Sequence, residues 1–315
     1  MRMVVVGVGG VGGVLGARLA SAGQRVGFVA RGETLAALRT EGLHVTTPEG
    51  ELHVPRPEAS DVPGELGAAD ALFLCTKLYD LGEAAAACRP IVREDTLIVP
   101  IQNGIEADEL VAARLGRGRI APGLVYTISG SEAPGRVRQS SDLYRFVFGL
   151  REPAEAAEAA EPVRAAARAL EAACRAAGID ATLVDDIRAR LWAKLVFLGS
   201  VAAITCLSGL RAGRMRASPS TRALFVEAMR EVIAVAAAEG VVLEGELVER
   251  SLELLDSLPA EGTSSMHADL MSGRRLEVEW LSGAVARRGR ARGVPTPIHG
   301  TAYACLLPHA GGDIG

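Results

Sequence analysis

The amino-terminal segment alternates between apolar runs and glycine-rich or helix-like stretches. Residues 3–8 (MVVVGV) are apolar at nearly every position and rich in valine, which is typical of a strand buried on both faces of a parallel sheet. Residues 15–23 (LGARLASAG) read as a helix closed by Gly23, and residues 25–31 (RVGFVAR) as a second strand. Together these segments predict a βαβ unit.

The alternation of strands and helices continues as far as residue 115. Apolar runs at 71–75 (ALFLC) and 97–101 (LIVPI) predict further buried strands, and the segments 81–88 and 106–115 predict helices. Because strands that alternate with helices usually form parallel sheets, this part of the chain predicts an α/β domain.

Two segments depart from this pattern. Residues 43–55 (LHVTTPEGELHVP) hold two short alternating runs around Pro-Glu-Gly, which predicts an inserted β-hairpin. Residues 121–149 hold short β-like runs separated by Gly and Pro. We expect these runs to form antiparallel strands on the far side of the sheet.

The composition changes near residue 151, and the rest of the chain is mostly helical in pattern. Residues 154–177 are rich in Ala, Glu and Arg, at spacings that favour a solvated helix over a linker. Further helices are expected over 185–207, 219–239, 244–257, 274–292 and 298–307. We therefore predict an α/β domain over residues 1–178 and an all-α domain over residues 179–315.

Composition narrows the possible classes of protein. The chain has 315 residues, of which 49% are hydrophobic, and this is enough for two domains with cores. A net charge of −4 provides no basic field for nucleic acid, and no Lys/Arg-rich run marks a membrane surface. No stretch of about 20 apolar residues lacks charge, so no transmembrane helix is expected. The apolar run at the amino terminus is too short and too glycine-broken for a secretory signal.

The cysteines indicate the redox environment. They are Cys75, Cys88, Cys174, Cys206 and Cys305. Their odd number, wide spacing and lack of a C-x-x-C pair predict reduced thiols rather than a disulfide framework or a zinc site. We expect a cytoplasmic protein without a metal.

A glycine motif follows the first predicted strand and opens the first predicted helix. It fits G-x-G-x-x-G, and in this βαβ context the pattern predicts a dinucleotide site. Gly7 permits the tight turn, Gly9 lets the backbone approach a pyrophosphate, and Gly12 lets helix and strand pack closely. The helix N-terminus supplies amide donors to the phosphates. The predicted cofactor-binding residues of this motif are Gly7, Val8, Gly9, Gly10, Val11 and Gly12.

The end of the second predicted strand bears on the choice of cofactor. An NAD site usually has an Asp or Glu there, whereas this chain has Arg31. A guanidinium binds a 2′-phosphate through two charge-assisted hydrogen bonds. The sequence therefore predicts NADP(H) rather than NAD(H), with an ordinary surface arginine as the alternative.

Two polar residues follow other strands of the predicted sheet. Lys77 comes after the strand at 71–75, and Asn103 after the strand at 97–101. Ligands of open α/β sheets bind at the carboxyl ends of the strands. Both side chains are therefore candidates for the site, and plain loop residues are the alternative.

Taken in order, these residues resemble the ketopantoate reductase family (2-dehydropantoate 2-reductases) over nearly the whole chain. The resemblance is carried by GVGGVG at 7–12, VAR ending at Arg31, CTK at 75–77, QNG at 102–104, LWAKL at 191–195, SSMHAD at 264–269, LEVEWLSGAV at 276–285 and VPTPIH at 294–299. It implies a Rossmann-type domain followed by an α-helical domain, with the active site in the cleft. It also implies NADPH-dependent reduction of 2-dehydropantoate to (R)-pantoate, a step towards pantothenate and coenzyme A.

The resemblance implies roles for five side chains. Lys194 matches the catalytic lysine that donates a proton, and Glu277 matches the active-site glutamate, expected beside Lys194 and the cofactor. Lys77 matches the lysine that contacts NADPH, and Asn103 the asparagine near nicotinamide and substrate. Ser265 matches a serine that hydrogen-bonds the substrate.

The chain departs from the family at the substrate-binding amides. The family pattern after the lysine is K-x-x-x-N-x-x-x-N, and this chain has Leu198 and Ala202 in place of its two asparagines. A third asparagine of the family is replaced near Ala212. Lys194, Leu198 and Ala202 share one face of the predicted helix. A less polar substrate-binding wall at Leu198 and Ala202 predicts weak ketopantoate binding or a different, more apolar 2-oxo acid or ketone.

Several alternatives stay open at this point. Arg211 or Arg214 either anchors a substrate carboxylate or faces solvent. His267 lies beside Ser265, but no nucleophile elbow accompanies them, which argues against a hydrolase. A non-catalytic NADP(H)-binding sensor is the alternative from another class of protein, and it is disfavoured by the presence of Lys194, Glu277, Ser265 and Asn103. The apolar helical half makes a homodimer a further expectation.

Overall fold

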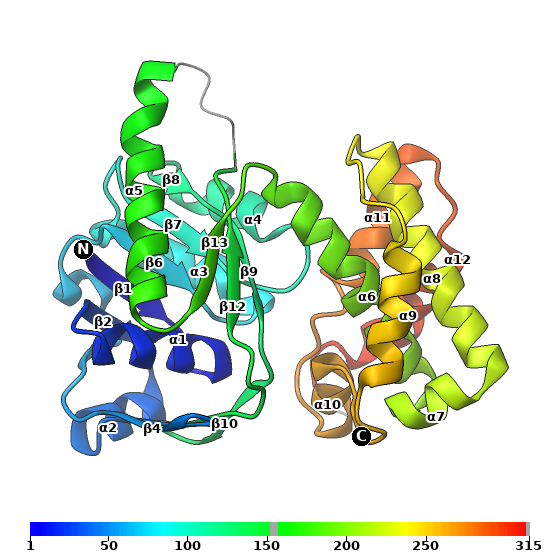
Figure 1. Cartoon of the computed structure of the whole chain (residues 1–315), viewed down its shortest axis with the longest axis horizontal. Helices are drawn as coiled ribbons and strands as arrows, with labels where there is room; N and C mark the ends of the chain where they lie inside the picture. Colours follow the sequence, from blue (N-terminus) through cyan, green and yellow to red (C-terminus); the bar gives the residue numbers. More distant parts are fainter. Residues whose placement is uncertain (152–156, 313–315) are drawn as a thin grey trace. The chain divides into compact units, whose positions relative to one another are not determined.

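The computed structural model describes residues 1–151 and 157–312, and it divides into two compact units (Figure 1). The first unit comprises Met1–Gln102 and Ala107–Ile187, and the second comprises Asn103–Glu106 and the chain from Arg188 onward. The sequence placed the boundary at 178/179. In the structure the two units divide at 187/188, because the strand that follows residue 178 belongs to a sheet of the first unit.

The first unit is built on a six-stranded sheet in the order β5-β2-β1-β6-β7-β8, with every neighbouring pair parallel. This confirms the α/β class and the strands expected at 3–8, 71–75 and 97–101. The strands are β1 (Arg2–Val6), β2 (Arg25–Val29), β5 (Glu58–Ser60), β6 (Ala71–Leu74), β7 (Leu97–Pro100) and β8 (Arg119–Ile120). The central strands are apolar throughout because helices cover both faces of the sheet.

Alternate residues of the central strands face different helices. Met3 and Val5 share one core with α1 (Gly10–Ser21) and α5 (Ala157–Ala176). The intervening Val4 and Val6 are equally buried but lie outside that core. They therefore face the other side, where α3 (Leu78–Ala87) and α4 (Ala107–Leu115) pack on β6 and β7. A further helix, α2 (Gly32–Thr40), follows β2.

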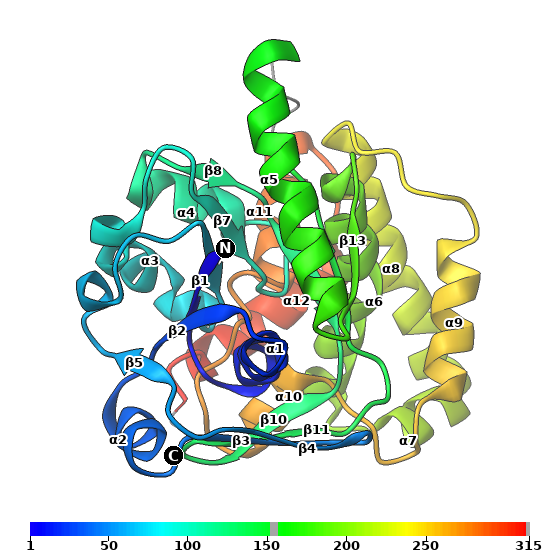
Figure 2. The ribbon, with the colours of Figure 1, turned by 60° about the vertical axis from the view of Figure 1, so that its left-hand side comes forward.

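Two smaller sheets complete the first unit. The hairpin predicted at 43–55 is present, with β3 (Leu43–Thr47) antiparallel to β4 (Gly50–Val54). The remaining strands are β9 (Gly123–Tyr126), β10 (Ser129–Ala133), β11 (Arg136–Gln139), β12 (Arg145–Phe148) and β13 (Asp180–Leu183). One sheet has the order β10-β11-β3-β4 and lies against α1 (Figure 2), and the other has the order β13-β12-β9.

The antiparallel strands predicted for 121–149 are present, with β10 antiparallel to β11 and β9 antiparallel to β12. They lie in the two smaller sheets and not in the main sheet. The sequence does not predict that β11 runs parallel to β3 and that β12 runs parallel to β13. Both pairings join strands far apart in the chain, so no local alternation of residues reveals them.

The described part of the second unit is helical. Its helices are α6 (Ile187–Ser208), α7 (Ala212–Ala217), α8 (Pro219–Ala238), α9 (Leu247–Ser257), α10 (Ser265–Met271), α11 (Ser282–Arg292) and α12 (Pro297–Leu306). Helix α8 packs against α7, α9, α11 and α12. Four predicted helices are confirmed within three residues at each end. The helix expected over 274–292 begins only at Ser282, and α7 and α10 are too short to show a periodicity.

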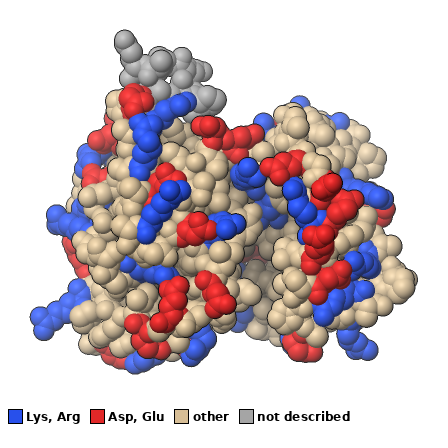
Figure 3. All heavy atoms as spheres, in the orientation of Figure 1, with Lys and Arg blue, Asp and Glu red and all other residues tan. Residues whose placement is uncertain are grey.

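Helix α6 is long and apolar enough to cross a membrane by length and composition alone. Most of its apolar stretch is buried within the protein, however, and this is the pattern of a core helix. On the face shown in Figure 3, acidic and basic side chains are interspersed over both units.

Candidate functional site

A cavity of about 330 Å³ opens at the carboxyl ends of β1 and β2 in the first unit. Its wall includes the loop after β1 and the residues that end β2 and follow β6. The lining residues are Val6, Gly7, Val8, Gly9, Val29, Ala30, Arg31, Thr34, Thr76, Asp80, Ala84 and Ser131. This is the edge of an open α/β sheet at which ligands bind.

Three positions in the loop are occupied by glycine, each for a different physical reason. Gly7 has a φ of +92°, a conformation that side chains other than glycine rarely adopt. A Cβ on Gly9 would project into open space, so its backbone is accessible from the cavity. A Cβ on Gly12 would collide with the carbonyl oxygen of Gly7 and lie 2.8 Å from the Cβ of Cys75. Gly12 is therefore required for the close packing of α1 against the strand ends.

The N-terminus of α1 is free to bind an anion. The residue that precedes it, Gly9, has no side chain to cap it, and its first turn contains no acidic residue. The amides and the positive end of the helix dipole are therefore available to phosphate groups. An open cavity, an accessible backbone at Gly9 and an uncapped helix end together fit the diphosphate of a dinucleotide.

Arg31 lies at the rim of this cavity, where it precedes α2 and is exposed to solvent. Glu33, in the first turn of α2, does not line the cavity. The wall at the end of β2 therefore presents a guanidinium where an NAD site presents a carboxylate. This arrangement suits the 2′-phosphate of NADP.

We expect Arg31→Gln to lower kcat/KM for NADPH about tenfold and to leave kcat/KM for NADH nearly unchanged, because only NADPH carries the phosphate. Arg39→Gln, on the exposed last turn of the same helix, is the matched control. Steady-state kinetics with both cofactors measure the effect. Equal losses with NADH and NADPH would remove Arg31 from phosphate recognition.

Gln102 connects the ends of β6 and β7. Its Nε2 donates to the carbonyl oxygens of Leu74 (2.8 Å) and Thr76 (3.0 Å), and its side chain is buried. Thr76 lines the cavity, and Lys77 follows it as the residue that precedes α3. Gln102 therefore fixes the backbone from which Lys77 extends, a role that the sequence reasoning did not assign.

The second unit brings Lys194 and Asn103 together. The Nζ of Lys194, on α6, donates to the Oδ1 of Asn103 at 3.0 Å. Removal from water lowers the pKa of Lys194 to about 8, and the charge of nearby Glu277 opposes part of this shift. At neutral pH the amine is mostly charged and still able to release its proton, which suits a proton donor.

Glu277 is buried, with 5% of its surface exposed. It lies in a turn before α11, where its carbonyl accepts from the amides of Trp280 (3.1 Å) and Leu281 (3.2 Å). The sequence reasoning placed it in a helix, so its setting differs from the expected one. A buried carboxylate close to Lys194 can orient the ammonium and stabilise its charge.

The predicted substrate-binding residues differ in accessibility. Leu198 is half-buried one turn after Lys194, whereas Ala202 is 1% exposed. Ser265 is exposed as the first residue of α10, and the neighbouring Ser264 is the buried residue that caps this helix, accepting from the amide of His267. Leu198 and Ser265 are therefore more accessible to solvent than Ala202.

Arg211 and His267, for which the sequence left two interpretations open, each have a partner within the protein. Arg211 pairs with Glu261 at 3.4 Å, and Arg214 is exposed on α7. The Nδ1 of His267 lies 2.6 Å from the hydroxyl of Thr263. These contacts favour the solvent-facing interpretation of Arg211 and provide no Ser–His pair.

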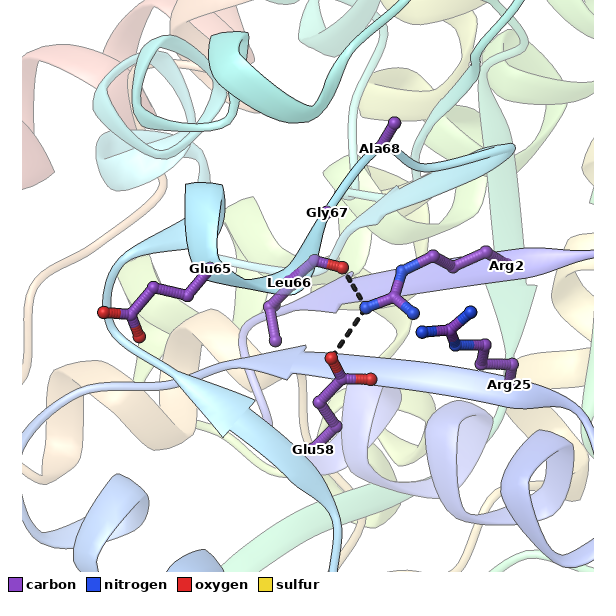
Figure 4. A pocket seen from close by; sticks show the side chains of 7 residues that line it. All are labelled: Arg2, Arg25, Glu58, Glu65, Leu66, Gly67 and Ala68. Carbon is purple, nitrogen blue, oxygen red and sulfur yellow. Dashed lines mark hydrogen bonds and ion pairs between the residues drawn. The ribbon is translucent and has the colours of Figure 1, made fainter.

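A second cavity, of about 340 Å³, lies at the opposite edge of the main sheet (Figure 4). Arg2 and Arg25, at the starts of β1 and β2, lie side by side in it. Glu58 pairs with Arg2 at 2.7 Å and offsets part of the positive charge. This edge carries the amino ends of the strands, so the cavity is separate from the glycine loop.

Comparisons with known proteins agree with this arrangement. Residues 3–153 match the family model described as "Ketopantoate reductase PanE/ApbA", and residues 186–309 match the model of its C-terminal part. The chain belongs to the ketopantoate reductase family. The 2-dehydropantoate 2-reductase of Mesorhizobium japonicum is 31% identical over 94% of each chain.

Other members of the ketopantoate reductase family extend the comparison. The uncharacterised oxidoreductase YkpB of Bacillus subtilis is 28% identical over 97% of this chain and 98% of its own. A crystal structure of a ketopantoate reductase family protein from Ralstonia eutropha has a TM-score of 0.87, with 29% identity and 98% of both chains covered. The protein is accordingly an NADP-dependent oxidoreductase of this family.

One signal in the sequence points to the family's functional amines without any alignment. Of the 34 Lys and Arg residues in the chain, two are lysines, Lys77 and Lys194. Arginine serves the other basic positions, but a guanidinium stays protonated and is too delocalised to act as a point charge. Lysine at these two positions therefore indicates a need for a compact ammonium, and at Lys194 for one that can release a proton.

Proposed function

We propose that the protein reduces a 2-oxo acid with NADPH, and that 2-dehydropantoate, reduced to (R)-pantoate, is its default substrate. The contact of Lys194 with Asn103, beside buried Glu277, is the observation that supports this most. Relatives named 2-dehydropantoate 2-reductase support the choice of substrate. We further propose that the first unit binds the cofactor and the second unit binds the substrate, in a cytoplasmic enzyme.

Each side chain has a distinct task in this proposal. Bound NADPH supplies the hydride. Gly7, Gly9 and the N-terminus of α1 would hold its diphosphate, Arg31 its 2′-phosphate, and Lys77 would contact it. Asn103 would hold nicotinamide and substrate together.

The charge that develops on the substrate oxygen requires a cation and a proton. The ammonium of Lys194 would stabilise that charge and deliver the proton. Glu277 would orient the ammonium or the substrate hydroxyl, and Ser265 would bind the substrate carboxylate. Lys194 would then recover a proton from solvent.

A more apolar 2-oxo acid or ketone is the second candidate, and Leu198 favours it. This half-buried side chain lies one turn from Lys194, at a position where the family pattern has an amide. A wall without that amide offers fewer hydrogen bonds to the polar end of ketopantoate.

NADPH oxidation measured against a panel of 2-oxo acids separates these proposals. Turnover of 2-dehydropantoate alone would reject the apolar substrate, and faster turnover of apolar 2-oxo acids would reject the default. Tight NADPH binding without turnover of any member would indicate a sensor and overturn the proposed reaction.

Leu198→Asn should lower KM for 2-dehydropantoate about fivefold, because the amide restores one hydrogen bond. Leu207→Asn, at a partly exposed position near the end of the same helix, is the control. Ala202 is left unchanged because an amide there would be buried. An unchanged KM in Leu198→Asn would remove this side chain from the substrate pocket.

A further inference from the structure

Four residues between β7 and α4 belong to the helical unit, although both flanking elements belong to the first. This segment, Asn103–Glu106, carries the amide that accepts from Lys194. Gly104 lies against the turn that carries Glu277, since a Cβ on it would be 3.0 Å from the carbonyl oxygen of Trp280. The segment therefore needs an anchor within the helical unit.

Glu106 supplies that anchor. Its Oε2 accepts from Arg287 Nη2 at 2.9 Å and its Oε1 from Arg288 Nε at 3.2 Å. Consecutive helical residues diverge, so one carboxylate reaches both arginines only when it lies between them. The Glu106 side chain is 13% exposed, so this is not a solvent-screened surface pair.

The two arginines are themselves held. Arg287 Nη1 donates to the carbonyl oxygen of Glu279 at 2.9 Å and also pairs with its carboxylate, which the hydroxyl of Tyr303 contacts as well. Arg288 pairs with Glu239 at 3.2 Å. Because Glu279 lies two residues after Glu277, one network ties both the segment with Asn103 and the turn with Glu277 to α11.

We propose that Glu106 is a positioning residue, which through Arg287 and Arg288 holds the Asn103 amide on the Lys194 ammonium. The inference rests on the proposed role of Lys194. Neither Glu106 nor the two arginines would touch a reactant; their ion pairs would act by holding Asn103 in place.

Steady-state kinetics of Glu106→Gln test this role. The variant keeps the shape of the side chain and removes its charge. We expect kcat to fall on the order of tenfold, with KM for NADPH nearly unchanged, since a small displacement of a catalytic group is costly. In an Asn103→Ala background the same change should have no further effect on kcat. Multiplying effects in the double variant would overturn the proposal.

Asp256→Asn is the matched control. Asp256 pairs with Arg222 at 2.6 Å on the same unit but is far more exposed than Glu106. Asp256→Asn should leave kcat unchanged, both alone and in the Asn103→Ala background. If Glu106→Gln does not fold, Arg287→Lys replaces it, because a lysine cannot bridge Glu106 and Glu279 as the guanidinium does.

Amine labelling of the apoprotein gives a readout that does not depend on turnover. The only lysines are Lys194 and Lys77, so mass spectrometry after brief acylation yields one internal ratio. Release of Asn103 should raise the ratio of Lys194 to Lys77 labelling several-fold in Glu106→Gln and not in Asp256→Asn. An unchanged ratio in folded Glu106→Gln would refute the positioning role, whereas an active Lys194→Ala enzyme would refute the proposed function instead.

Discussion

Lys194→Arg should reduce turnover about a thousandfold and change NADPH affinity by less than about twofold. The substitution keeps a positive charge on α6, but a guanidinium does not release its proton near neutral pH. Because the charge is kept and only the releasable proton is lost, this exchange isolates proton donation from charge. Stopped-flow or steady-state NADPH oxidation measures turnover, and cofactor titration measures affinity.

The reverse exchange on the same helix is the control for this prediction. Arg190 pairs with Glu244 at 3.0 Å and is about half exposed, so Arg190→Lys should leave turnover unchanged. Lys194→Ala, which loses the charge as well as the proton, should be at least as inactive as Lys194→Arg. A Lys194→Arg enzyme that retained a tenth of the activity, or more, would show that charge alone suffices and that the proton comes from elsewhere.

Gly12→Ala should destabilise the first unit by about 3 kcal/mol and weaken NADPH binding, because the added Cβ meets the Gly7 carbonyl and Cys75. Backbone on one side and a buried strand end on the other leave little room for relaxation. Thermal unfolding and NADPH titration measure the two effects.

Two other glycines separate packing from cofactor approach. Gly9→Ala meets no neighbouring atom, so it should keep the unfolding temperature and lose NADPH affinity. Gly300→Ala, in α12, also meets no neighbour, so it should leave NADPH affinity unchanged and should not lower the unfolding temperature. A fully stable Gly12→Ala protein would contradict the close packing of α1 on the loop.

The elements that the sequence predicts well are those whose residues report local constraints. The valine run of β1, the glycine loop and the alternation of the β3–β4 hairpin each express burial or backbone geometry within a few residues. The pairing of β11 with β3 joins distant segments and leaves no local trace. The turn before α11 was read as helix because Leu276 and Val278, both buried, extend the apolar pattern of the helix that follows.

The site shows the same division. Motif resemblance selected Lys194, Asn103 and Glu277, and the helical unit places these groups close together. Gln102 and Glu106 were missed because their importance comes from hydrogen bonds and ion pairs to distant residues, which spacing along the chain does not encode. Ala202 was assigned to the substrate from the family pattern and its helical phase, neither of which reports that the residue is only 1% exposed.

The pH dependence of 2-oxo acid reduction at saturating NADPH and substrate tests proton donation by Lys194 most directly. Because burial lowers the pKa of Lys194 to about 8, the ammonium form is lost as pH rises through that value. The rate should be level below it and fall about tenfold per pH unit above it, and this titration should be absent from the residual activity of Lys194→Ala. A rate that stays level to about pH 10, or a titration near pH 8 that persists in Lys194→Ala, would contradict the assignment of the proton to Lys194.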